Sequence, residues 1–339
     1  MAVHVLILAA SFLIILAGSE MFTNGVEWAG QRLQISEAAV GSLLAAVGTA
    51  LPETFVPAIA LLAGRDDLAA HSAVGLGAII GAPLMLSTLA LAVMGMAGVL
   101  YRSRRGRAVL DVRREDVRRD LAFFLPTFFT LVLLGLIHPG PVVRSTMAFV
   151  LLAVYCVYGF VMLRLKRADH VELEQGLHFE RIFGGQQYAP RFAITLAQII
   201  AGVAAILFGA MEFVDQIILF ARHANLNPGV LSLILSPLAT ELPEKYNSVV
   251  WIRQRKDNLA LANITGAMVF QSCIPVALGV AFTPWVLTPP ELLGGTIGLV
   301  SAMLLYLNVR DSRLGTPTLM IGGVGYAGFI VGLGVLGFF

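Results

Sequence analysis

The stretch Gly-Thr-Ala-Leu-Pro-Glu at residues 48–53 decides the fold, because it returns 191 residues later as Ala-Thr-Glu-Leu-Pro-Glu at residues 239–244. Around these motifs the two halves of the chain align without a gap. The further matches at the same offset are Asp66 with Asp257, Leu68 with Leu259, Ala69 with Ala260, Gly75 with Gly266, and Gly18 with Gly209. Chance similarity between apolar helices yields Leu and Ala matches, but it does not readily yield Thr-x-Leu-Pro-Glu twice. We therefore expect an internal repeat.

The composition around the repeat is that of a membrane protein. Of the 339 residues, 58% are hydrophobic and 13% are charged, and the mean hydropathy is +0.83, whereas soluble domains carry about 25% charged residues. A helix that spans a bilayer needs about 20 apolar residues. By this measure the sequence contains ten candidate spans, which are 3–29, 36–63, 72–100, 120–137, 143–164, 190–222, 227–252, 259–284, 290–307 and 316–339.

The spans divide equally between the two copies of the repeat. An odd number of spans per copy makes the second copy enter the membrane from the opposite side, so the repeats are inverted. We expect an all-α membrane protein of ten transmembrane helices. Its parts are a first five-helix repeat at 1–164, a cytoplasmic linker at 165–189 and a second five-helix repeat at 190–339.

Transporters built from inverted repeats bind their substrate near the midplane, on interrupted helices. Pro52 and Pro243 predict such interruptions, because proline removes a backbone donor and clashes with the preceding turn. Further residues are expected to loosen the same regions. They are Gly48, Gly75, Gly77, Gly81 and Pro83 in the first copy, and Pro237, Gly266 and Pro275 in the second.

Basic residues are distributed unevenly between the loops, and this asymmetry predicts the topology. The loop at 101–119 alone carries eight arginines, and one face of the membrane would hold 19 of the 23 basic residues. The positive-inside rule places that face in the cytoplasm. Both termini and the loop at 64–71 are then expected outside the cytoplasm.

The motif carboxylates are the strongest functional signal. Glu53 and Glu244 lie near the centres of the second and seventh spans, where an ionisable residue costs at least about 2.5 kcal/mol and is functional by default. The structural alternative is a protonated acid that serves helix packing, but the same acid recurs in both copies. Thr49 and Thr240 precede the acids by one helical turn and offer hydroxyl oxygens. Such an all-oxygen set suits hard cations such as Ca²⁺ or Na⁺, as well as protons.

These motifs resemble the α-repeats of the Ca²⁺:cation antiporter superfamily, which includes the sodium/calcium and cation/proton exchangers. The resemblance covers essentially the whole chain and indicates a prokaryotic member. It implies that the motif glutamates bind the exchanged ions, while flanking Ser and Thr residues and backbone carbonyls complete the shell. Carried over, Glu53 and Glu244 are the central ligands, with Thr49 and Thr240 beside them.

The sequence departs from the family pattern around the motifs. The family usually has Ser where this chain has Ala50 and Glu241, and it typically has Ser-Asn-Ile-Phe-Asn after the glycine of the next helix. Here Leu-Gly-Ala-Ile-Ile follows Gly75, and Ala-Met-Val-Phe-Gln follows Gly266. The remaining candidate ligands are Glu241, Gln271, Ser72 and its counterpart Asn263.

Lys245 is a cation at mid-membrane depth that the family pattern does not predict. On a helix, Glu241, Glu244 and Lys245 would share one face. Lys245 then neutralises Glu241 for packing, or it acts in ion coupling, either in the place of a monovalent cation or as a proton carrier. The sequence leaves these readings open.

The sequence favours a secondary active cation antiporter that exchanges Ca²⁺ for Na⁺ or H⁺ by alternating access. A monovalent cation/proton antiporter is the alternative, and a passive cation channel is a different class that would need a continuous polar pore. No motif of a hydrolase, cofactor or ATP site is present, so we expect no enzyme, and the coupling energy should come from an ion gradient. The expected partners are inorganic cations and the lipid bilayer, with no nucleic acid and no partner protein inferred. The expected location is a bacterial inner membrane.

Overall fold

The computed structural model describes residues 2–32, 51–62, 67–102, 109–165, 177–179, 192–309 and 313–338. The first half contains α1 (Ala2–Arg32), α4 (Leu51–Leu62), α5 (Leu68–Met85), the π-helical turn η2 (Leu86–Ala90), α6 (Leu91–Leu100), α8 (Arg114–Ile137) and α9 (Pro141–Leu165). The second half contains α11 (Phe192–Ala224), α12 (Pro228–Thr240), α13 (Leu242–Arg253), α14 (Asp257–Phe282), α15 (Pro289–Asn308) and α16 (Thr316–Val335).

Each of the ten predicted spans overlaps at least one of these helices. Within the described residues, eight helical segments are long and apolar enough to cross a membrane, and α4 and α12 are shorter apolar helices. α4 is the described end of the second span, and the rest of that span lies outside the described residues. The seventh span is divided between α12 and α13.

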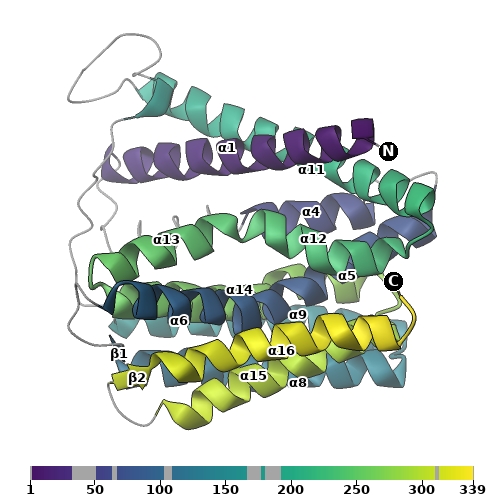
Figure 1. Ribbon diagram of the computed structural model, residues 1–339. Helices are drawn as coiled ribbons and strands as arrows, with labels where there is room; N and C mark the ends of the chain where they lie inside the picture. The colour runs from purple at the N-terminus through teal and green to yellow at the C-terminus, as the bar shows by residue number, and fades with distance from the viewer. Residues whose placement is uncertain are drawn as a thin grey trace.

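The helices run roughly along one common direction, in layers. α1 and α11 lie along one side of the bundle and α8, α15 and α16 along the opposite side, with α4, α12, α13 and α14 between them (Figure 1). Both chain termini lie at one end of the bundle, as the inverted five-helix repeats predict (Figure 1). At the other end, β1 (Val109–Asp111) pairs antiparallel with β2 (Arg313–Gly315).

Several helices begin at residues whose side chains cap them. Asp67 accepts a hydrogen bond from Ala70 N at the start of α5, at 3.0 Å, and Asn227 accepts one from Gly229 N at the start of α12, at 2.8 Å. Such caps satisfy backbone donors that the helix itself leaves without partners. They fix where each helix enters the bundle.

α1 and α11 contact each other through their glycines. A Cβ atom at Gly18 would lie 2.9 Å from the carbonyl oxygen of Gly202, and one at Gly209 would lie 3.0 Å from the carbonyl oxygen of Ser11. The repeat offset relates these two contacts, because Gly18 corresponds to Gly209 and Ser11 corresponds to Gly202. The interface is therefore mutual, as in a twofold-symmetric pair.

The glycines of α5 do not loosen their helix, so that prediction is wrong. α5 is helical from end to end, and a Cβ atom at Gly77 would lie 2.3 Å from Gly229 O. At Gly81 it would lie 2.3 Å from Leu233 O. The glycines instead allow α5 to approach α12 closely, which is the role of small residues four apart in membrane helices.

Gly266, Pro275 and Pro83 were also predicted to loosen their helices, but the chain stays helical past each of them. α14 is continuous through Gly266 and Pro275. After Pro83 the helix continues as the π-helical turn η2, and the Ser87 hydroxyl donates a 2.7 Å hydrogen bond to the Pro83 carbonyl. Such turns and hydroxyl groups satisfy backbone carbonyls where the helix departs from regular geometry. Gly48 lies outside the described residues.

Candidate cation-binding site

Glu53 and Glu244 each lie in the first turn of a helix that begins inside a predicted span. Glu53 is the third residue of α4, and Glu244 is the third residue of α13. α12 ends at Thr240, and Glu241 forms the break before α13 with φ −93° and ψ 8°. Pro243 therefore starts a helix, where its missing N–H costs nothing. Both carboxylates consequently lie at the positive end of a helix dipole.

The carboxylates at these helix ends are almost completely buried. The exposed fractions are 5% for Glu53, 0% for Glu241 and 3% for Glu244. Glu244 and Glu241 of the second repeat lie near enough to Glu53 of the first for their charges to act on it. Neither carboxylate oxygen of Glu53 has a hydrogen-bond partner among the described residues. Buried carboxylates without donors are costly, and a bound cation or proton removes that cost.

Carboxylates alone do not form a complete metal site here. Among the residues that the structure describes, no three His, Cys, Asp or Glu side chains form a group that could hold a metal ion. A cation bound near Glu53 and Glu244 therefore needs hydroxyl, amide or backbone carbonyl oxygens as well, which are ligands that Ca²⁺ and Na⁺ accept.

Lys245 forms an ion pair with Glu241. Lys245 Nζ lies 3.2 Å from Glu241 Oε2 and donates a 3.4 Å hydrogen bond to the carbonyl oxygen of Pro237. The lysine side chain is 6% exposed, and its charge also acts on Glu53. An ammonium group is thus part of the site itself.

The other predicted ligands that the structure describes lie on α5, α12 and α14. Thr240 is buried at the end of α12 and no longer shares one continuous helix with Glu244. Gln271 is buried beside Glu241, and its Oε1 has no hydrogen-bond partner in the described part of the chain. Ser72 and Asn263 are half-buried in the second turns of α5 and α14. Thr49 lies outside the described residues.

The described polar groups of the site come mainly from the second repeat. Gln271 corresponds by the repeat offset to Ile80, which is buried and apolar. Glu241 corresponds to Ala50, and Lys245 corresponds to Thr54. The two repeats share their central glutamate but not the groups around it, so the site is asymmetric.

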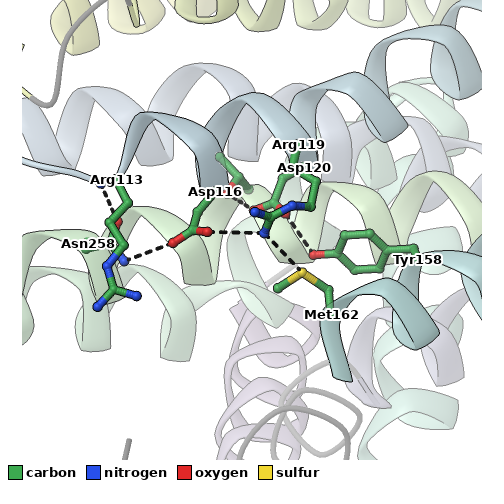
Figure 2. Close-up of polar contacts among 8 residues, drawn as sticks. Arg113, Asp116, Arg119, Asp120, Tyr158, Met162 and Asn258 are labelled. Atoms are coloured by element: carbon green, nitrogen blue, oxygen red, sulfur yellow. Dashed lines mark hydrogen bonds and ion pairs between the residues drawn. The ribbon is translucent and has the colours of Figure 1, made fainter. Parts of the chain in front are cut away.

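Sequence reasoning missed another buried carboxylate, that of Asp120 in α8. The Tyr158 hydroxyl donates to its Oδ1 at 3.1 Å (Figure 2). The Thr265 hydroxyl donates to Oδ2 of Asp120 at 2.5 Å. These partners join α8 and α9 of the first repeat to α14 of the second. An acid at the start of a predicted span was visible in the sequence, but its partners on two other helices were not.

Asp120 is the inner part of a larger polar network. Asp116 forms a 3.1 Å ion pair with Arg119, one turn apart on α8, and the Asn258 side chain reaches Asp116 from α14 (Figure 2). The backbone N–H of Arg113 donates to Asn258 at 2.6 Å. Because these groups satisfy one another, we assign the network to structure rather than to ion binding.

Buried carboxylates in the first turns of α4 and α13, in a bundle built from inverted repeats, define a membrane transporter for cations. The chain belongs to the sodium/calcium exchanger protein family, whose profile matches residues 3–164 and 194–337. It is thus a membrane cation antiporter of that family and not an enzyme.

Individual proteins show the same relationship. The chain is 24% identical to CaxA of Alkalimonas amylolytica over 327 residues, which cover 93% of this chain and 92% of CaxA. It is 23% identical to the inner membrane protein YrbG of Escherichia coli K12, over 88% of this chain and 85% of YrbG. The crystal structure of the H⁺/Ca²⁺ exchanger CAX superposes with a TM-score of 0.75 at 16% identity, over 97% of this chain and 81% of CAX. This likeness confirms the ten-span fold of inverted repeats.

Proposed function

We propose that this protein exchanges Ca²⁺ for Na⁺ or H⁺ by alternating access at a site whose central ligands are Glu53 and Glu244. The observation that carries the proposal is the position of the two motif carboxylates. Each is buried in the first turn of a helix that starts inside a span, and the two come from opposite repeats. Thr49, Thr240, Glu241, Gln271, Ser72 and Asn263 are the further candidate ligands.

Calcium is the substrate that the family and the chemistry favour together. The family is named for sodium/calcium exchange, and the similar fold of CAX belongs to an H⁺/Ca²⁺ exchanger. Carboxylate, amide and hydroxyl oxygens are ligands of hard cations. The sequence contains no ATP-binding loop, and the energy for transport therefore comes from the gradient of the second ion.

A monovalent cation/proton antiporter is the second candidate, and two observations favour it. Lys245 adds a positive charge to the site, and Ile80 replaces a polar group in the first repeat. Both changes reduce the attraction for a divalent ion. A passive cation channel is the candidate from another class, but Glu53, Glu241 and Glu244 lie together near the starts of α4 and α13 rather than along a path across the membrane.

We also propose that the protein lies in a bacterial inner membrane with both termini outside the cytoplasm. The positive-inside rule supports this orientation. The termini lie at the end of the bundle opposite β1 and β2 (Figure 1). The relative YrbG is named as an inner membrane protein.

Flux measurements in proteoliposomes test the proposed function. Purified protein is reconstituted, and Ca²⁺ uptake is followed while an outward Na⁺ gradient, K⁺ gradient or pH gradient is imposed singly. We expect uptake to require one of the Na⁺ and pH gradients. Exchange of Na⁺ or K⁺ for protons without Ca²⁺ transport would favour the second candidate, and Ca²⁺ entry that needs no counter-gradient would favour a channel.

A further inference from the structure

The Lys245 ammonium lies where a small cation would bind. Its two contacts are a carboxylate oxygen of Glu241 at 3.2 Å and the backbone carbonyl of Pro237 at 3.4 Å. Both oxygens lie at the break between α12 and α13, and broken helices in transporters bind monovalent cations through the carbonyls at such C-terminal ends. The ammonium is held by the kind of oxygen ligands that would otherwise hold an ion.

The charges at the site can be counted from the described residues. The ionisable groups whose charges act on Glu53 are Glu241, Glu244 and Lys245. Three carboxylates and one ammonium give a net charge of −2 when all four are ionised. Gln271 and Tyr326 also lie near Glu241, and neither carries a fixed charge. Because desolvated charge is costly unless it is compensated, the bound ions should bring the site close to neutrality.

We propose that Lys245 is a tethered cation that permanently fills one ion-binding position, so that each transport cycle carries two positive charges in either direction. This inference rests on the proposed function and deepens it. One divalent cation or two monovalent cations balance a charge of −2. Exchange of one for the other then moves no net charge across the membrane.

Substitution of the pair changes the charge of the site in a defined way. Lys245→Met keeps a long side chain but removes the ammonium, which leaves a net charge of −3 and vacates the position beside Glu241. The double substitution Lys245→Met with Glu241→Gln returns the net charge to −2. Lys245→Arg keeps the positive charge and serves as the matched control.

The test measures ion flux and electrical current together in proteoliposomes at fixed pH, with Ca²⁺ and whichever of Na⁺ or H⁺ drives its uptake. We expect the wild type to exchange about two coupling ions per Ca²⁺ without current. Lys245→Met should need about three and carry about one charge per Ca²⁺, while the double variant and Lys245→Arg should keep the wild-type ion count and carry no current per Ca²⁺, even where their rates are lower. A wild-type current of one charge or more per Ca²⁺, or an unchanged ion count in Lys245→Met, would refute the proposal.

A second measurement separates this inference from the proposed function and does not depend on transport. The thermal unfolding midpoint of detergent-solubilised protein is measured in NaCl against choline chloride at constant ionic strength, since a bound ion stabilises the folded state. We expect Na⁺ to stabilise Lys245→Met more than it stabilises the wild type or the double variant. If the wild type transports no Ca²⁺ but this difference is found, the proposed function fails and the tethered cation stands. Equal stabilisation of all three proteins overturns the tethered cation.

Discussion

Glutamine matches the size of Glu53 and Glu244 but lacks the charge that compensates a desolvated cation. We therefore expect Glu53→Gln and Glu244→Gln each to reduce Ca²⁺ exchange at least about 100-fold, because loss of one partner of a buried ion pair costs about 3–5 kcal/mol and each 1.4 kcal/mol corresponds to about tenfold. Initial rates of Ca²⁺ uptake into proteoliposomes measure the effect.

A matched control for these substitutions is Glu291, which is as deeply buried but caps α15 through Thr288. Glutamine can also close such a capping box, so Glu291→Gln should retain exchange and folding. Exchange at the wild-type rate in either motif variant would show that the central ligands lie elsewhere.

Some residues of the site could be found from the sequence, and others could not. The repeat identified Glu53 and Glu244, and helical spacing was sufficient to pair Lys245 with Glu241. The interruption predicted at Pro243 is present, with the break at Glu241, but the sequence did not show that Pro243 would start α13, because proline can kink a helix or start one. Tyr326 was missed for another reason: it lies on α16, near enough to Glu241 for the carboxylate charge to act on it, and nearness between distant helices leaves no local pattern.

At the scale of helices, Asp120 joins the two repeats. Replacement by alanine would leave the buried hydroxyls of Tyr158 and Thr265 without their acceptor, and each such loss costs about 1–3 kcal/mol. We expect Asp120→Ala to lower the thermal unfolding midpoint clearly in detergent. Glu115→Ala, an exposed acid in the first turn of the same helix, should change it little. Equal midpoints for the two variants would contradict this role for Asp120.

Asp67 joins two helices at the end of the bundle where the termini lie. The hydrogen bond from Ala70 N and the contact with Arg222 of α11 hold the pKa of this carboxyl below its ordinary value. Because the folded-state pKa is lowered, its stabilisation is present above the ordinary pKa of about 4 and is lost as the pH falls through the lowered pKa.

Asp67→Asn should therefore lower the unfolding midpoint at pH 7, and the difference from the wild type should shrink as the pH falls below about 4. Arg222→Gln removes the ion pair but leaves the helix cap, so its effect should be smaller. Unfolding midpoints measured between pH 3 and pH 7 test this, and a difference that stays constant with pH would show that the charge of Asp67 does not matter.

For the molecule as a whole, the sequence predicted the number of spans and their order. Hydropathy locates membrane helices well because every backbone polar group in lipid must be satisfied within a helix. The β1–β2 pair was not predicted, since each strand has three residues and its partner lies about 200 residues away. The close approach of α5 to α12 was also missed, because glycine can loosen a helix or pack it tightly.

Membrane orientation is a prediction for the whole chain that two exposed positions can test. Gly140 lies between α8 and α9, where a Cβ atom meets nothing within 4 Å, and Gln254 lies in the turn after α13. In a background without Cys156 and Cys273, Gly140→Cys should react with an impermeant maleimide added to intact cells, and Gln254→Cys should react only after the membrane is opened. The reverse pattern would invert the proposed topology.

The mutual glycine contact of α1 and α11 bears on which conformational state this transporter prefers. Each of the two helices makes the same glycine contact with the other. The pair therefore packs equally well if the two repeats exchange their conformations. The glycine contact by itself therefore favours neither the inward-facing nor the outward-facing state. Any bias comes from the groups that the repeats do not share, such as Lys245 and Gln271. Such a bias changes the rates of exchange but not its direction, because the ion gradients across the membrane decide which way the exchanged cations move.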